Sequence, residues 1–192
     1  MKAQSTQIDS HERGLVHAAQ LGDSRAFKAL YERHRDQVYN LAYYSLGDAL
    51  WAEDVLQIIF FKIHRGLPRF RFESNLATWI YRITLNELQN QQRRRGVEWV
   101  PLEAVLGSDE EFDSNSLPDF RTLDNQRREI LQQAVLQLSP KLRTVVLLKY
   151  FEGLSYGEIA ELLGCASGTV ASRLNRALKE MEARLRPLRR LL

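Results

Sequence analysis

The chain has 192 residues, of which 44% are hydrophobic and 27% are charged, and its formal net charge is +3. This composition is typical of a soluble globular protein and excludes a largely disordered one. No apolar run is long enough to cross a bilayer and the N-terminus lacks a signal-peptide core, so we expect a cytoplasmic protein without membrane insertion. The single cysteine, Cys165, excludes an internal disulfide and a metal site built from several thiolates.

Helical patterns dominate the first half of the chain. Four helices are predicted around residues 12–20, 24–45, 48–65 and 75–94, because apolar residues recur there every three or four positions. Asp23 and Asp48 are the predicted N-caps of the second and third helices. The third is expected to end near Gly66 and Pro68. The residues expected to face inward from the fourth are Leu76, Trp79, Ile80, Ile83 and Leu88.

A change of composition separates the two halves. Residues 96–124 are rich in Gly, Ser, Pro and acidic residues, which predicts a flexible acidic linker with one helical turn near residues 102–106. Four more helices are predicted after it, through 130–138, from Ser139 to Tyr150, from Ser155, and from Ser167 to Leu185. Ser139 is the expected N-cap of the second, with Pro140 at its first helical position. No long alternating pattern indicates a strand, so the predicted fold class is all-α.

The strongest local signal is a helix-turn-helix between Leu154 and Ala177. Ser155 and Glu158 have the spacing of a capping box, in which each side chain bonds the backbone of the other residue. Gly164 is expected to adopt a positive φ in the turn, and Ser167 is expected to cap the second helix. The inward face of that helix is predicted to hold Val170, Leu174, Ala177 and Leu178.

The outer face of this second helix suits DNA. It carries Thr169, Ser172, Arg173 and Arg176. Arginine can donate two hydrogen bonds to a guanine edge, and hydroxyl groups can bond phosphates or bases. The alternative is an ordinary helical hairpin with a solvated basic face.

The sequence gives little support for metal binding, cofactor binding or catalysis. The four histidines lack metal-ligand spacing, His34 is expected to be packed, and no nucleophile elbow, phosphate-binding loop or dinucleotide fingerprint is present. We therefore expect no metal, no cofactor and no catalysis by this chain alone. Cys165 is predicted to be a small packed residue, with redox sensing as the alternative.

Four segments together resemble the extracytoplasmic-function, or group IV, sigma factors of bacterial RNA polymerase. Residues 18–34 resemble the first conserved region of that family, and residues 52–71 its polymerase-binding helix. Residues 77–95 are similar to the element that reads and opens the −10 promoter region, and residues 138–178 to the domain that reads the −35 element. The resemblance implies a sigma2 domain at residues 1–95, an acidic linker at 96–125 and a sigma4 domain at 126–192.

The resemblance also implies partners. Sigma2 would dock on the clamp of the polymerase β′ subunit through Glu53, Asp54, Gln57 and Phe61, while sigma4 would contact the β flap. Ile58 departs from the family, in which Glu is usual. Many members are held inactive by an anti-sigma factor, so the resemblance implies such a partner here. The acidic linker would pass near the active centre of the polymerase, or serve simply as a soluble spacer.

The DNA-binding residues follow from the same resemblance. Those implied for the −10 strand, whose unstacked base is captured in a pocket, are Phe70, Arg71, Phe72, Ser74, Asn75, Arg82, Asn86, Arg93 and Arg94. Phe72 stands where Gly is common, and Trp79 is expected to serve the core rather than to stack on a base. Those implied for the −35 duplex are Ser155, Ser167, Thr169, Ser172, Arg173, Asn175 and Arg176. Ala171 and Asn175 depart from the family, so the −35 sequence recognised is expected to differ.

These observations predict a sigma factor that binds core polymerase and directs promoter-specific initiation. It would recognise −35 duplex DNA and the unstacked −10 non-template strand, and the polymerase would perform the bond chemistry. Two alternatives remain open. One is a stand-alone helix-turn-helix regulator that binds duplex operators, and the other is a sigma-like decoy for an anti-sigma factor. The sequence names neither the inducing signal nor the genes controlled.

Overall fold

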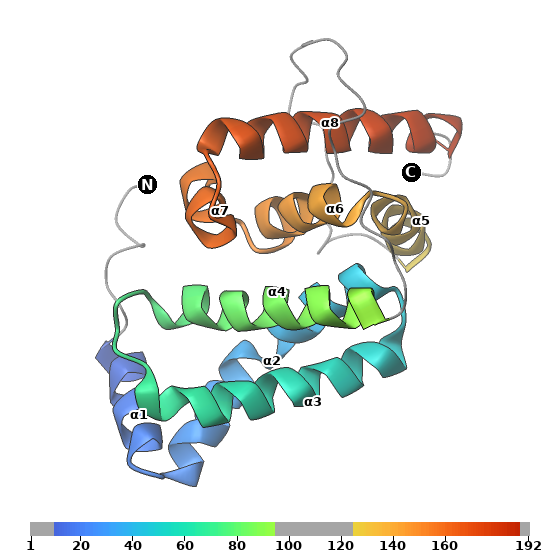
Figure 1. The fold of residues 1–192 in the computed structure, drawn as a ribbon. Helices are drawn as coiled ribbons and strands as arrows, with labels where there is room; N and C mark the ends of the chain where they lie inside the picture. The colour runs from blue at the N-terminus through green and yellow to red at the C-terminus, as the bar shows by residue number, and fades with distance from the viewer. Residues whose placement is uncertain (1–9, 95–124, 189–192) are drawn as a thin grey trace. The chain divides into compact units, whose positions relative to one another are not determined.

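A computed structural model describes residues 10–94 and 125–188 of the chain. The described residues form helices and no strand, which confirms the predicted all-α class. The chain divides into two compact units, residues 1–42 with 48–91 and residues 43–47 with 92–192 (Figure 1). The predicted linker and its helical turn lie outside the described residues. Within the described ranges, no helix has the length and apolar character needed to cross a membrane.

The first four helices agree closely with the sequence pattern. They are α1 (Ser10–Gln20), α2 (Ser24–Leu46), α3 (Ala49–Gly66) and α4 (Leu76–Arg94), with a short 3-10 turn η1 (Leu67–Arg69) after α3. Both predicted N-caps are present. The Asp23 carboxylate accepts from the backbone N of Arg25 at 2.8 Å, and the Asp48 carboxylate accepts from the N of Trp51 at 2.7 Å. These bonds satisfy donors that a helix start leaves unpaired.

Ion pairs and an apolar core hold these helices against one another. Glu12 Oε1 of α1 lies 3.2 Å from both Arg33 Nε and His34 Nε2 of α2, and His34 is only 5% exposed. His34 is therefore packed, as predicted. Lys62 of α3 pairs with the buried Glu87 of α4. The apolar core around them includes Val16, Leu30, Val38, Leu41, Val55, Ile59, Phe60, Ile63, Leu76, Ile80 and Leu88.

The second group of helices is built around α8. It comprises α5 (Asn125–Leu136), α6 (Pro140–Val146), a π-helical turn η4 (Leu147–Phe151), α7 (Tyr156–Leu163), α8 (Ser167–Leu185) and a 3-10 turn η5 (Arg186–Leu188). Helix α8 packs against α5, α6 and α7 (Figure 1). The core residues are Leu131, Val135, Leu138, Leu142, Val145, Val146, Ile159, Val170, Leu174, Ala177, Leu178 and Met181. The helix predicted from Ser139 to Tyr150 is thus α6 continued by η4.

Two predicted side-chain caps are wrong. Ser139 does stand at the N-cap of α6, but its hydroxyl makes no capping bond and is buried without a hydrogen-bond partner. Helix α8 begins one residue earlier than a Ser167 cap requires, so that Ala166 is the N-cap and Ser167 is the first helical residue.

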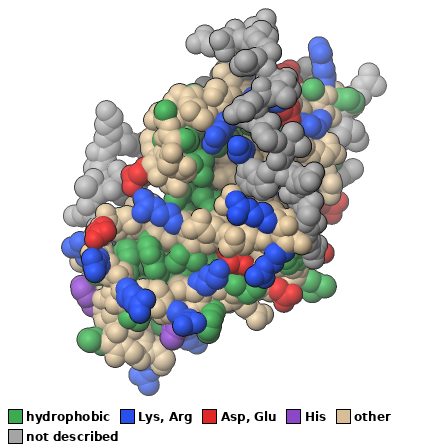
Figure 2. Space-filling view, in the orientation of Figure 1, with side chains coloured by type: hydrophobic (Ala, Val, Ile, Leu, Met, Phe, Trp, Pro, Cys, Tyr) green, Lys and Arg blue, Asp and Glu red, His purple; other side chains and the backbone are tan. Residues whose placement is uncertain are grey.

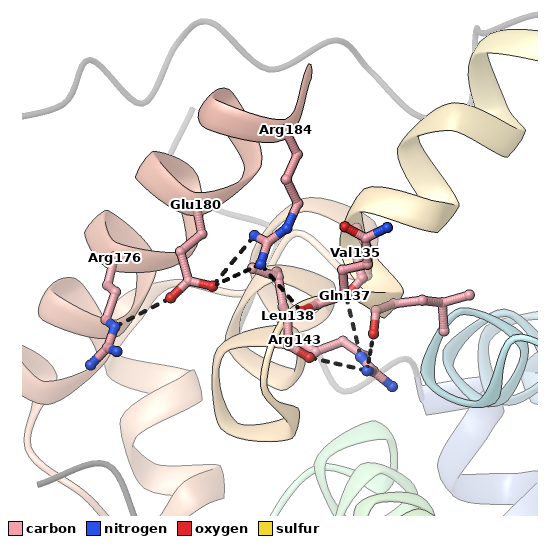
Figure 3. Close-up of polar contacts among 8 residues, drawn as sticks. Val135, Gln137, Leu138, Arg143, Arg176, Glu180 and Arg184 are labelled. Atoms are coloured by element: carbon pink, nitrogen blue, oxygen red, sulfur yellow. Dashed lines mark hydrogen bonds and ion pairs between the residues drawn. The ribbon is translucent and has the colours of Figure 1, made fainter. Parts of the chain in front are cut away.

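Arg143 caps the C-terminal end of α5 (Figure 3). Its guanidinium donates to the carbonyl oxygens of Val135 at 3.2 Å and Leu138 at 3.0 Å, and also to that of Leu136. These carbonyls end α5, where a cation is favoured by the helix dipole. Burial lowers the pKa of Arg143 to about 10, so the side chain is charged at neutral pH.

Candidate nucleic-acid interface

The predicted capping box is present at the start of α7. The backbone N of Ser155 donates to Glu158 Oε2 at 2.8 Å, and the backbone N of Glu158 donates to Ser155 Oγ at 3.3 Å. A third bond runs from Ser155 Oγ to Glu158 Oε2 at 2.7 Å. The hydrogen bond from the Ser155 hydroxyl, then that from its backbone, holds the pKa of Glu158 below its ordinary value. The Ser155 side chain is thereby occupied in shaping α7.

The turn between α7 and α8 also has the predicted geometry. Gly164 has φ +63°, a left-handed conformation that glycine adopts without steric cost. The backbone N of Cys165 donates to the carbonyl of Ala160 at 3.0 Å, which closes the turn. Cys165 itself is half-buried. The turn therefore fixes the angle at which α8 leaves α7.

One stripe of α8 gathers four of the predicted −35 residues. Thr169, Ser172, Arg173 and Arg176 follow one another at three- and four-residue spacing, opposite the buried face that begins at Val170. Ser172 is exposed and the other three are half-buried, as is Asn175 beside them. In helix-turn-helix proteins the second helix lies in the major groove, and the stripe has residue types that suit such a contact.

A carboxylate organises the C-terminal end of this stripe (Figure 3). Glu180 Oε1 lies 3.3 Å from Arg176 Nε, and Glu180 Oε2 lies 3.4 Å from Arg184 Nη1. Arg184 Nη2 also reaches the carbonyl of Gln137 at the end of α5, at 3.5 Å. Glu180 thus restrains the guanidinium of Arg176 from one side.

Arg173 has a different environment. Its Nε is buried and has no hydrogen-bond partner. Burial keeps this atom out of reach of DNA, so the terminal nitrogens of the guanidinium are the donors left for a phosphate or base edge.

A second polar stripe lies on α4. Its exposed face carries Arg82, Asn86 and Arg93, and the last two follow Arg82 by four and by eleven residues. Arg94 is exposed beside them. In Figure 2 most of the charged side chains on the face that shows α4 are Lys and Arg, and they lie beside a hydrophobic patch. Positive charge spaced in this way suits a phosphate backbone, and the Asn86 amide can both donate to and accept from a base edge.

The loop before α4 is built on aromatic packing. Phe70 is buried, with its ring centroid 4.9 Å from Phe72 and 5.1 Å from Trp79. The Trp79 ring lies so close to Gly66 that a Cβ there would meet it at 3.0 Å. Trp79 packs against Phe70 and Gly66 but is half-buried, so it lies at the edge of the core and not inside it. The Phe70 side chain supports the loop from inside.

Polar residues close the other end of the loop. Asn75 Oδ1 accepts from the backbone N of Thr78 at 2.6 Å and so caps α4. The Ser74 hydroxyl donates to the Asn75 carbonyl at 3.3 Å, while Arg71 is exposed. The loop residues implied for −10 binding therefore have different positions. Phe70 packs inside the loop, Asn75 caps α4, and Arg71 is exposed at the surface.

Phe72 has an unusual backbone. Among the described residues it is the non-glycine residue with positive φ, at +59°. This conformation costs an L-residue roughly 1–2 kcal/mol. The Phe72 ring contacts His17, with centroids 4.9 Å apart, and Arg13 lies 5.3 Å above it. An aromatic pair contributes about 0.5–1.5 kcal/mol and a surface cation–π contact about 0.5–1 kcal/mol. The ring contacts are thus large enough to offset the backbone strain.

A third surface lies on α3. Its buried face includes Val55 and Ile59, whereas all four residues implied for polymerase binding, Glu53, Asp54, Gln57 and Phe61, are exposed. Phe61 is 62% exposed and Ile58 is 38% exposed. The helix therefore presents acidic, amide and apolar groups together. Large apolar groups exposed beside acids are typical of a protein-binding face.

Comparison with known proteins decides the family. The sequence model of sigma-70 region 2 matches residues 30–97, and that of sigma-70 region 4 matches residues 128–181. The chain is 37% identical to the RNA polymerase sigma-H factor of Pseudomonas aeruginosa over 183 residues, which cover 92% of this chain and 94% of that protein. This chain belongs to the extracytoplasmic-function sigma factors. The predicted resemblance is thereby confirmed.

Further relatives of this sigma factor agree. It is 34% identical to the extracytoplasmic-function sigma-E factor of Escherichia coli over 182 residues, covering 91% of this chain and 94% of that one. Its structure resembles that of the Bartonella quintana sigma factor RpoE, solved with the anti-sigma factor NepR, with a TM-score of 0.61 and 28% identity. That match covers 83% of this chain and 96% of the other. The domain boundaries and site residues assigned from the sequence remain predictions.

Sequence reasoning missed several contacts of this sigma factor. Arg13, His17 and Gln20 of α1 meet the loop from outside the matched region 2 segment, and Glu180 restrains Arg176. The sequence shows the spacing of the three α1 residues on one helical face and the four-residue offset between Arg176 and Glu180. The spacing on α1 does not identify the loop as the partner of that face.

Proposed function

We propose that this sigma factor binds core RNA polymerase and directs initiation at promoters that it reads at two places. Helix α8 would read duplex DNA at the −35 element, while α4 and the loop before it would read the unstacked −10 non-template strand. The observation that carries the proposal is the presence in one chain of two separate basic stripes, each on a helix whose opposite face is buried. The chain would bind and position, and the polymerase would do the chemistry.

The stripe on α8 has the chemistry for duplex readout. Arg173 and Arg176 can each donate two hydrogen bonds to the O6 and N7 atoms of guanine, and Asn175 can pair in the same way with adenine. Thr169 and Ser172 can bond phosphates and set the register of the helix. Ser167, in the first turn, adds a hydroxyl where the helix dipole favours an anion.

The stripe on α4 suits a single strand. Extruding a base costs a few kcal/mol, which contacts with its edge and faces must offset. Asn86 supplies the edge contact in this proposal, while Arg71, Arg82, Arg93 and Arg94 hold the backbone. The exposed positions of these side chains on α4 and the loop support that division of roles.

The exposed face of α3 is the proposed polymerase contact. Glu53, Asp54 and Gln57 would meet the β′ clamp, and Phe61 would insert its ring as an apolar anchor. Ile58 enlarges the apolar part of this face where the family usually has Glu. The second group of helices would contact the β flap.

An anti-sigma factor is a further proposed partner. Support comes from the related sigma factor RpoE, which was solved in complex with the anti-sigma factor NepR. Such a protein would compete for surfaces that polymerase or DNA needs. The proposed role places this chain in the cytoplasm, where the polymerase works.

The deciding experiment is transcription from a promoter library by core polymerase with the purified chain. Both promoter elements are randomised, and the transcripts are sequenced. We expect enrichment of a defined −35 motif and a defined −10 motif. Polymerase binding without enrichment of either motif would favour a sigma-like decoy. Operator binding without polymerase-dependent transcripts would favour a stand-alone regulator.

A further inference from the structure

One face of α1 projects three side chains toward the loop before α4. Arg13, His17 and Gln20 stand at i, i+4 and i+7, which places them on a single stripe of the helix. Val16, on the adjoining face, is 1% exposed and anchors α1 in the core. The stripe is therefore held at a fixed distance from the loop.

Gln20 fixes the beginning of the loop. Its single amide nitrogen donates to the carbonyl of Leu67 at 3.0 Å and to that of Phe70 at 2.9 Å. Both hydrogens of the amide are thus used, and two backbone carbonyls that follow α3 are satisfied. Gln20 thus links α1 to a turn that the backbone bond from Phe70 N to the Leu67 carbonyl also holds.

Phe72 fixes the middle of the loop. Its ring meets the rings of His17 and Phe70, with both centroids 4.9 Å away, and lies below the guanidinium of Arg13 at 5.3 Å. These neighbours surround a ring that is itself half-buried. The left-handed backbone at φ +59° persists because the ring is held in this way.

We propose that Phe72 is a positioning residue, and that α1 sets the base preference of the −10 loop through it. With the ring clamped, residues 73–75 enter α4 along one path, and the exposed side chains of the loop meet DNA in one arrangement. If the clamp is lost, the left-handed backbone relaxes and the loop samples several paths. This inference rests on the proposed −10 role of the loop and gives α1 a part in promoter selectivity.

The first test compares substitutions at Phe72 in the full chain with core polymerase and the randomised promoter library. Phe72→Ala and Phe72→Gly should each lower the preference for the favoured −10 bases by about fivefold or more, since contacts of this size change populations by that factor. Phe72→Tyr keeps an aromatic ring and should retain the wild-type profile. The −35 preference should be unchanged in all three variants.

Thermal unfolding separates positioning from folding. Gly adopts positive φ freely, so Phe72→Gly should unfold at a higher temperature than Phe72→Ala although both lose −10 preference. If Phe72 only stabilised the fold, the loss of −10 preference would follow the loss of thermal stability, and Phe72→Gly would keep more of the preference than Phe72→Ala. If the library profile of Phe72→Gly is that of the wild type, the proposal is wrong.

The second test leaves Phe72 intact and changes α1. We expect the double variant Arg13→Gln with His17→Ala, and separately Gln20→Ala, to weaken −10 preference in the same direction as Phe72→Ala. The matched control is Arg35→Gln, because Arg35 is also exposed on this unit but pairs with Asp36 and does not contact the loop. Its profile should equal that of the wild type.

The outcomes distinguish this inference from the proposed function. If the wild-type chain directs no motif-specific initiation, the proposed function itself fails. If the wild type does so and the α1 variants keep its −10 profile while Phe72→Ala loses it, Phe72 touches DNA directly and the positioning role is wrong. Loss in both sets, with an intact −35 motif, supports the proposal.

Discussion

At the scale of single residues, we expect Glu180 to affect the proposed DNA binding through Arg176 as well as through its own charge. Its carboxylate lies beside Arg176 and Arg184 on α8, so it both lowers the local positive charge and restrains one guanidinium. A restrained arginine loses less side-chain freedom when it meets a base, which favours specific contacts. Removal of the carboxylate should therefore raise the affinity for DNA of any sequence and lower the discrimination of the −35 motif.

We expect Glu180→Gln to bind scrambled duplex DNA more tightly at low salt and to discriminate the −35 motif less. The added positive charge strengthens attraction to phosphates, while Arg176 loses its orienting partner. The measurement is the ratio of dissociation constants for motif and scrambled duplexes across a salt series. Glu182→Gln is the matched control, with the same charge change on an exposed position of α8. An equal fall of the ratio in both variants would assign the effect to charge alone.

Arg173 offers a complementary prediction. Arg173→Ala should cost about 1–3 kcal/mol in −35 binding if the side chain reads a guanine, and the loss should be confined to motif DNA. Binding measured by titration on motif and scrambled duplexes checks this. Arg186→Ala, which removes an exposed arginine of η5, serves as the control. A similar loss on both duplexes would reduce Arg173 to a phosphate contact.

At the scale of elements, the capping box makes the stability of α7 depend on pH. The hydrogen bonds from Ser155 lower the pKa of Glu158 below its ordinary value of 4.5. The ionised carboxylate is therefore better stabilised in the folded chain than in the unfolded chain. This contribution is fully present above pH 4.5 and is lost as the pH falls through the lowered pKa.

Glu158→Ala should lower the thermal midpoint of the full chain at pH 7 by a few degrees, since a capping bond of about 1 kcal/mol has that effect on a domain of this size. The difference from the wild type should shrink as the pH falls below 4.5, where the carboxylate of the unfolded chain becomes protonated, and should be lost once the pH is below the lowered pKa of the folded chain. Melting curves over pH 3–7 (roughly the range in which a carboxylate titrates) test this. Glu182→Ala is the control, and a difference that does not change with pH would contradict the assignment.

The helix starts show how far local sequence reaches. Asp23, Asp48 and Ser155 cap as their spacing predicted, because each bond is made within three residues along the chain. Ser139 and Ser167 do not cap: the Ser139 hydroxyl is buried without a hydrogen-bond partner, and Ala166 stands at the N-cap of α8. The pattern identifies a helix start to within a residue, while tertiary contacts choose the capping atom.

At the scale of the whole molecule, the proposed polymerase face would act before the proposed DNA stripes, because the chain joins the polymerase before the holoenzyme meets a promoter. Defects at the two surfaces should therefore respond differently to the concentration of the chain. Phe61→Ala should weaken binding to core polymerase, because it removes a 62% exposed ring proposed as the anchor. Transcription should then be restored by raising the concentration of the chain, as mass action requires.

The comparison is made with Arg173→Ala, whose defect lies in the DNA contact of the assembled holoenzyme and should persist at saturating concentration. Initiation at one selected promoter, measured over a titration of each variant against fixed core polymerase, separates the two. If excess Phe61→Ala chain does not restore the wild-type rate, Phe61 has a role after assembly.

The sequence by itself determined the all-α class, the family, the helix-turn-helix with its capping box, and the faces of α3, α4 and α8 that are exposed. These properties depend on periodicity and on bonds between near neighbours, which a linear pattern records. Only the tertiary structure decided that Arg143 caps the end of α5 and that α1 holds the loop through Gln20 and Phe72. Those contacts join groups on different elements, whose proximity is created by packing and is not recorded in the linear pattern.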